Sequence, residues 1–183
     1  MKNGNFYNNI ASDVRVELLD EFDQNFTRKA FFDKPWPEVK MPNKRGSLMM
    51  RAGALRRSVR ALNIPNGVGF ASSMPYAKIQ NKGGTIKVTA KMKRFFWAMH
   101  YSLAGKVVYS VKKKKAASTK SNRALSVEAE YWKALALKKV GSKLTIKQRQ
   151  FIGHHPQVDI AVRRVVDDNF QEYNKELKNT FKT

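Results

Sequence analysis

The chain has 183 residues, enough to build one domain around an apolar core, and it contains no cysteine. The absence of cysteine excludes disulfides, thiolate zinc sites and cysteine catalysis. The formal net charge of +22 is concentrated in residues 39–127, which hold 20 Lys or Arg and no Asp or Glu. Such a region indicates a negative partner, either nucleic acid or an acidic protein, unless it is a basic surface covered by solvent and counterions.

The hydropathy of the chain argues against a membrane protein. No stretch of 18 or more apolar residues is present, and the first residues lack the apolar segment of a secretion signal. We therefore expect no membrane span and no export, with the cytoplasm as the compartment of synthesis.

Residues 6–30 predict an amphipathic helix, because large apolar residues recur at every fourth position. These residues are Phe6, Ile10, Val14, Leu18, Phe22 and Phe26. Acidic residues occupy the other face, and Pro35 and Pro37 end the helical pattern. The apolar stripe is typical of a helix that packs on a core, with docking of a partner helix as the alternative.

The next segments predict a β-hairpin. A short helix over residues 48–55 precedes a strand over 58–64, where polar and apolar residues alternate. Residues 65–67, with the sequence PNG, supply a turn to a returning strand over 68–71.

Beyond the hairpin, residues 75–80 predict a short helix or turn that ends at two glycines, and residues 85–89 predict a third strand. Residues 92–101 form a dense aromatic cluster. We expect Phe95, Phe96 and Trp97 to lie in the core, because burial stabilises side chains of this size by about 1.5–3 kcal/mol each. The alternative is that aromatic and basic residues together form a nucleic-acid surface.

Residues 103–125 predict a basic excursion. A possible strand over 106–111 leads into four consecutive lysines, and the stretch AASTKSNRA that follows has the composition of a disordered loop. Ser126 is then expected to cap a helix that runs to Val140 and stops at Gly141.

The last part of the chain predicts a closing amphipathic helix over residues 158–181, from its regularly spaced Val, Tyr, Leu and Phe residues. Together the elements predict an α+β fold, in which a small antiparallel sheet packs against long N- and C-terminal amphipathic helices. The whole chain, residues 1–183, is expected to form a single domain with the basic excursion around 103–125.

The search for chemistry finds no catalytic, metal or cofactor site. There are three histidines, and none has a second histidine at a ligand spacing such as i+4. His154 and His155 precede the closing helix, where a capping or exposed role is the expected one. No phosphate-binding loop, GxSxG or complete GxGxxG occurs, so we expect a protein that is not an enzyme.

Four short segments carry a resemblance to a known family. They are RAGALRRS at 51–58, PYAKIQ with two following glycines at 75–84, KMKRFFW at 91–97 and IKQRQFIG at 146–153. In this order and spacing the chain resembles the phage virion morphogenesis family, also described as tail completion or head–tail joining proteins. Lys147 and Gln150 stand where that family usually has proline, and the lysine-rich excursion is not shared by shorter members.

The resemblance suggests roles for residues around the last segment. Phe151 and Ile152 would anchor the start of the closing helix in the core, and Gly153 would permit a turn that a side chain obstructs. Arg149 would pair with an acid of its own or a neighbouring subunit, and we expect Arg149, Tyr76 and Gln80 at a subunit interface. The alternative is that these residues only hold the fold.

The function that the resemblance implies is structural. We expect a virion protein of the neck or tail of a tailed bacteriophage, assembled in the host cytoplasm as a homo-oligomeric ring around the DNA passage. Its partners would be a connector or adaptor on one side and tail proteins on the other. Lys112, Lys113, Lys114 and Lys115 would face an acidic partner or the DNA. The alternatives are a soluble, non-specific nucleic-acid-binding protein and an assembly chaperone absent from the particle.

Overall fold

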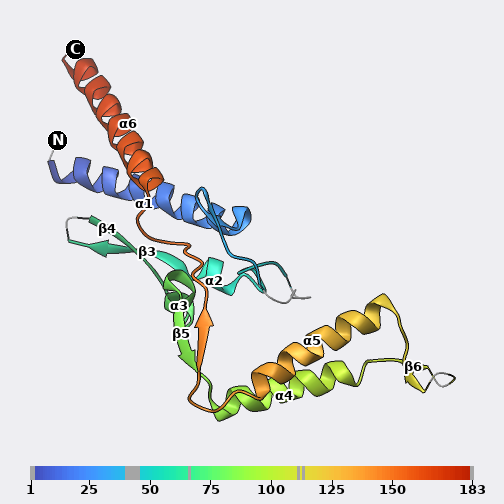
Figure 1. Ribbon diagram of the computed structural model, residues 1–183. Coiled ribbons are helices and arrows are strands. Elements are labelled where there is room, and N and C mark those ends of the chain that lie inside the picture. Colours follow the sequence, from blue (N-terminus) through green and yellow to red (C-terminus); the bar gives the residue numbers. More distant parts are fainter. Residues whose placement is uncertain (1–2, 40–45, 66, 111, 113, 182–183) are drawn as a thin grey trace. The chain divides into compact units, whose positions relative to one another are not determined.

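The computed structural model describes residues 3–39, 46–65, 67–110, 112 and 114–181 (Figure 1). In this part of the chain it contains six helices, and its eight short strands form four antiparallel pairs. The fold is α+β with long N- and C-terminal helices, as the sequence predicts.

The chain divides into two compact units. The first contains residues 1–83 and 147–183, and the second contains residues 84–146. In chain order the second unit is therefore an insertion within the first. The region around 103–125, for which the sequence predicts a loop excursion, belongs to this larger and mainly helical insertion.

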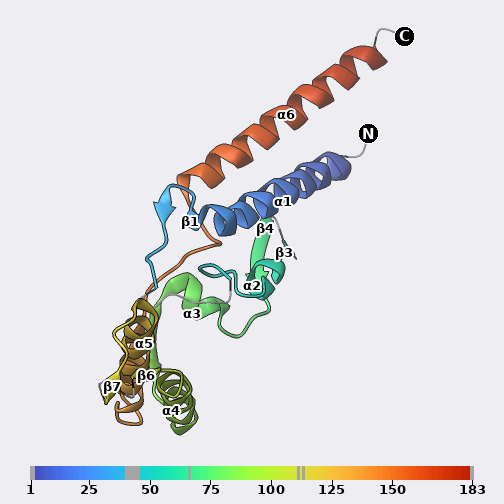
Figure 2. The same ribbon diagram turned by 90° about the vertical axis from the view of Figure 1, so that its right-hand side faces the viewer.

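The first unit is built on two long helices, α1 (Asn3–Arg28) and α6 (Pro156–Thr180). They run antiparallel and side by side, so that the start of α1 and the end of α6 lie at the same end of the helix pair (Figure 2). At that end the ring of Phe6 lies 4.8 Å from the ring of Tyr173. The apolar stripe of the N-terminal helix is thus covered by the chain's own closing helix and sheet residues.

Two strand pairs belong to this unit: β1 (Ala30–Phe31) with β2 (Lys34–Pro35), and β3 (Val59–Ile64) with β4 (Gly67–Ser72). The β3–β4 hairpin is the one that the sequence predicts, although Asn66 of its turn lies outside the described residues. The helix predicted over residues 48–55 starts later, as α2 (Ala54–Arg57). Its start is delayed because Gly53 adopts a left-handed conformation, with φ of +68°.

Two adjoining clusters of buried side chains form the core of the first unit. The first cluster contains Val14, Leu18, Phe22, Phe31, Phe32, Ala161 and Val165. The second cluster contains Phe26, Trp36, Leu55, Ala77 and Phe151. Ile152 is half-buried and packs against both clusters, so the segment that leads into α6 passes between them.

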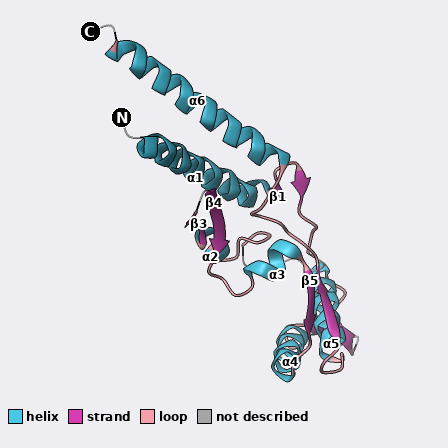
Figure 3. Cartoon of the chain, turned by 90° about the vertical axis from the view of Figure 1, so that its left-hand side faces the viewer, coloured by secondary structure: helices cyan, strands magenta, loops and turns pink. Residues whose placement is uncertain are grey.

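The second unit is a helical hairpin flanked by two strand pairs, as the colouring of Figure 3 shows. Its elements are β5 (Gly84–Lys87), α4 (Ala90–Ala104), β6 (Tyr109–Ser110), β7 (Lys115–Ala116), α5 (Lys120–Ala136) and β8 (Lys143–Ile146). Helices α4 and α5 pack against each other, and Ala129 and Ala136 are buried between them because small side chains allow close approach.

Three expectations for this unit are wrong. The helix expected from Ser126 begins at Lys120, because Thr119 caps it by accepting a hydrogen bond from the backbone N–H of Asn122, and it ends at Ala136 instead of Val140. The stretch AASTKSNRA at residues 116–124, expected to be disordered, therefore has its second half, residues 120–124, inside a helix. Phe96 is buried as expected, but Phe95 is 54% exposed, although its ring lies 5.7 Å from that of Trp132 in α5.

Candidate functional site

Residues 147–153 lead into α6 and are anchored in the core of the first unit by Phe151. The side chain of Phe151 has no exposed surface, and its ring lies 5.4 Å from that of Phe26. The segment has no regular secondary structure, so its backbone N–H and C=O groups need other partners. Those partners are side chains from three different parts of the unit.

Asn81, in α3 (Ala77–Lys82), provides the most extensive set of these bonds. Its Oδ1 accepts hydrogen bonds from the backbone N–H groups of Phe151 at 2.8 Å and Ile152 at 3.1 Å. Its Nδ2 donates to the carbonyl oxygen of Ile152 at 3.0 Å. One amide side chain thus satisfies three backbone groups in the segment.

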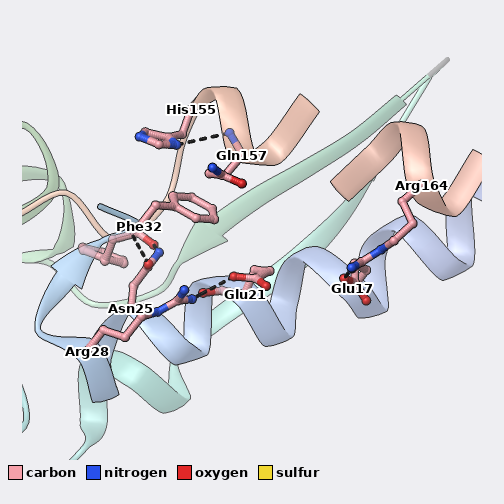
Figure 4. Close-up of polar contacts among 9 residues, drawn as sticks. Glu17, Glu21, Asn25, Arg28, Phe32, His155, Gln157 and Arg164 are labelled. Carbon is pink, nitrogen blue, oxygen red and sulfur yellow. Dashed lines mark hydrogen bonds and ion pairs between the residues drawn. The ribbon is translucent and has the colours of Figure 1, made fainter. Parts of the chain in front are cut away.

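Asn25 and Trp36 hold the same segment from the other side. Trp36 donates from Nε1 to the carbonyl oxygen of Gln150 at 2.5 Å, and Asn25 donates from Nδ2 to that of Phe151 at 3.3 Å. Asn25 also accepts a bond from the backbone N–H of Phe32 at 2.9 Å, which Figure 4 shows. Asn25 is fully buried, and these bonds explain why a polar residue is tolerated there.

Arg149 makes its contacts with backbone groups of its own chain. Its guanidinium donates to the carbonyl oxygens of Pro37 at 2.9 Å and Glu38 at 3.3 Å. Its backbone N–H donates to the backbone carbonyl oxygen of Gln80 at 2.8 Å. Partial burial lowers the pKa of Arg149. The sequence suggested an acidic partner, whereas the structure has Arg149 fastening the 36–38 loop to the segment before α6.

The last residues of the segment set the direction of α6. Gly153 has φ of +134°, a backbone conformation that residues with a side chain rarely adopt. His155 then caps α6, because its Nδ1 accepts the backbone N–H of Gln157 at 3.3 Å (Figure 4). The imidazole is buried, stacks on Phe32 at 4.7 Å and contacts Asp33 through Nε2 at 2.8 Å.

The segment at residues 51–58 is fixed onto α1 from the same core. Leu55 is buried in the second cluster, and the guanidinium of Arg56 forms a bidentate ion pair with Asp23. The hydrogen bond with Asp23 raises the pKa of Arg56. Ser58 donates from its hydroxyl to the carbonyl oxygen of Leu55 at 2.7 Å. Each of these side chains therefore has a partner within the fold.

Tyr76 and Gln80, the other two expected interface residues, lie at and within α3. Tyr76 is 43% exposed. Gln80 is half-buried, and its Oε1 is enclosed without a hydrogen-bond partner among the described residues. The three expected interface residues are therefore close together in the first unit. The backbone N–H of Arg149 bonds to the carbonyl oxygen of Gln80, and Gln80 follows Tyr76 by one helical turn.

An apolar groove of about 690 Å³ lies next to this segment and was not predicted. Its lining includes Val14, Leu18, Val68, Phe70, Val158 and Val162. It is bounded by α1, the β4 strand and the first turns of α6, with Ile152 and Gly153 at its margin. The groove has an apolar lining with no cluster of titratable groups, which suits packing of an apolar surface better than chemistry.

The expected lysine cluster lies in the second unit. Lys112, Lys114 and Lys115 are exposed, and Lys113 lies outside the described residues. The Lys115–Ala116 strand pairs with Tyr109–Ser110, so these lysines occupy a short ribbon between α4 and α5. They are not part of the site formed by residues 147–153.

Among the residues with described positions, no group of three or more His, Asp or Glu side chains is arranged to hold a metal ion. None of the helices in the described ranges is both long enough and apolar enough to cross a bilayer.

Comparisons of the chain with protein-family models, with curated proteins and with solved structures found no match.

Proposed function

We propose that this chain is a structural protein of a tailed bacteriophage particle, acting in neck or tail completion and head–tail joining as a subunit of a ring around the DNA passage. Its partners are further copies of itself, a connector or adaptor, and tail proteins. The protein performs assembly and no catalysis.

The observation that carries this proposal is the convergence of three of the four segments on which the family resemblance rests. Leu55, Ala77 and Phe151 come from those three segments, and all three belong to one buried cluster. Asn81, within the second segment, bonds to Phe151 and Ile152 of the last. Residues that are scattered in the sequence therefore act as one unit in the fold, and this supports the proposal.

The ring interface in this proposal uses the exposed side of α3. Tyr76 offers an exposed aromatic side chain, a residue type that is enriched in protein interfaces. The enclosed Oε1 of Gln80 lacks a donor among the described residues, and a neighbouring subunit can supply one. Arg149 supports this surface from inside by fixing the backbone around Gln80.

The test is the location of the protein. Intact particles of the virus that encodes this chain would be purified, heads separated from tails, and the chain quantified in each fraction by mass spectrometry. We expect a low, fixed copy number at the head–tail junction or the end of the tail. Absence from every particle fraction would contradict the proposal and favour a chaperone or a soluble nucleic-acid-binding protein.

A further inference from the structure

The second unit has a charge composition unlike that of the first. Residues 84–146 contain 15 Lys or Arg, and their only acids are Glu128 and Glu130. Thirteen of the 15 basic residues are lysines. Among the described basic residues of this unit only Lys133 has an ion pair, with Glu130 at 3.5 Å.

Part of this charge gathers where the helical hairpin turns. We call the exposed residues Lys106, Lys112, Lys114, Lys115 and Lys120 the tip cluster. Asn122 fixes the ribbon to the start of α5, since its Nδ2 donates to the carbonyl oxygens of Val108 at 2.7 Å and Ala117 at 2.8 Å. These bonds hold Val108 and Ala117, which flank the ribbon, against the start of α5.

A second group lies at the other end of the hairpin. We call Lys87, Lys138, Lys139 and Lys143 the base cluster, and all four are exposed. Lys87 and Lys143 are directly opposite each other in the β5–β8 pair. Like charges at opposed positions destabilise a strand pair, so the arrangement gains from a bound polyanion.

Three arginines of the first unit are used differently. Arg28, Arg56 and Arg164 form ion pairs with Glu21, Asp23 and Glu17, two of which Figure 4 shows. These contacts occupy acids of α1 that would otherwise attract the lysines of another copy. The charge of these three arginines is thereby partly neutralised, whereas the lysines of the tip and base clusters have no ion pair among the described residues.

We infer that the second unit binds the phosphate backbone of nucleic acid through its tip and base clusters. The 15 residues of α4 separate the two clusters by about 22 Å, at about 1.5 Å per residue. A duplex carries one charge per about 1.7 Å, so that span of DNA presents about 13 phosphates. Lysine suits this task because a flexible ammonium group meets phosphates without selecting a base.

Duplex and single-stranded nucleic acid share this phosphate chemistry. Trp97 stacks on Tyr101 at 5.6 Å on α4, and Tyr101 is 65% exposed, which gives bases of a single strand a surface on which to stack. The binding experiment therefore includes both forms. This inference does not depend on the proposed function, since it concerns the isolated chain.

The test is fluorescence anisotropy of the full chain with labelled 20-base-pair duplex and 20-nucleotide single-stranded DNA, over a series of salt concentrations. The variant K112Q/K114Q/K115Q/K120Q removes four charges from the tip cluster. The control variant K34Q/K78Q/K175Q/K178Q removes four exposed charges from the first unit. Circular dichroism and thermal melting of both variants establish that they fold.

We expect the full chain to bind DNA with an affinity that falls steeply with salt. The tip variant should weaken binding at least about tenfold. It should also reduce the slope of the logarithm of the binding constant against the logarithm of the salt concentration by about three to four, because each lost phosphate contact contributes about 0.9. The control should change the slope by less than about one. Equal losses in both variants would overturn the inference, because bulk charge alone would then explain binding. Stronger binding to acidic peptides or anionic vesicles than to either DNA would also overturn it.

Discussion

Asn81 and Ile152 are 71 positions apart in the chain, yet they form a reciprocal pair of hydrogen bonds. The backbone N–H of Ile152 donates to Oδ1 of Asn81 at 3.1 Å, and Nδ2 of Asn81 donates to the carbonyl oxygen of Ile152 at 3.0 Å. The pairing resembles that of two strands, although one partner is a side chain. It joins α3 to the segment that sets the direction of α6.

Replacing Asn81 with Ala should lower the free energy of unfolding by about 2–3 kcal/mol, because three backbone groups of a partly buried segment lose their partner. Urea denaturation followed by circular dichroism measures this. Asn63→Ala is the matched control, since Asn63 is exposed on β3 and should change stability by less than about 0.5 kcal/mol. Equal effects of the two substitutions would show that the Asn81 bonds add nothing.

Arg149→Ala and Tyr76→Ala should separate folding from assembly. Arg149→Ala removes charged hydrogen bonds to two carbonyls, so we expect a loss of about 1–3 kcal/mol of stability. Tyr76→Ala removes an exposed side chain, so we expect an unchanged melting temperature and a loss of ring formation. Mass photometry and thermal melting measure the two properties. A Tyr76→Ala protein that assembles normally would exclude α3 from the interface.

Arg56→Lys should be more harmful than the same change at the adjacent Arg57. A lysine cannot reproduce the bidentate contact with Asp23, and since both side chains are partly exposed we expect a loss of about 0.5–1 kcal/mol. Arg57 is exposed and its side chain makes no ion pair within the described residues, so Arg57→Lys should be near neutral. Thermal unfolding of the two variants at low and high salt tests the difference, which should shrink with salt.

Removing the second unit should leave the first unit folded. Gly84 and Ile146 are opposite each other in the β5–β8 pair, so their Cα atoms lie about 5 Å apart, within reach of a short Gly-Ser linker. We expect the shortened chain to unfold cooperatively and to keep the helical signal of α1 and α6. A chain without a cooperative transition would show that the first unit depends on the insertion for its stability.

The sequence predicted those elements whose residues follow a regular pattern. The stripe from Phe6 to Phe26 marks α1 and the alternation over 58–64 marks β3, since both periods report a face turned to the core. A capping or exposed role was expected for His154 and His155 from their place at the entry to the last helix, and His155 is the cap.

The remaining parts depend on long-range contacts that no local pattern reports. Strand β8 is four residues long and is defined by its pairing with β5, far away in the chain. In the sequence Asn25 and Asn81 look like ordinary polar residues of helices. Their role as hydrogen-bond partners of the irregular backbone at residues 150–152 is visible only in the structure. The helix start at Lys120 was hidden because its polar first turn has the composition of a loop.

The facing positions of Gly84 and Ile146 also have a genetic consequence. The second unit leaves and re-enters the first at neighbouring points, so one insertion or deletion event in the gene could add or remove it without rerouting the surrounding chain. Relatives with and without the unit would then share α1, β3, β4, α3 and α6 in the same order. Relatives without the unit should therefore align with this chain when a gap is allowed over residues 84–146.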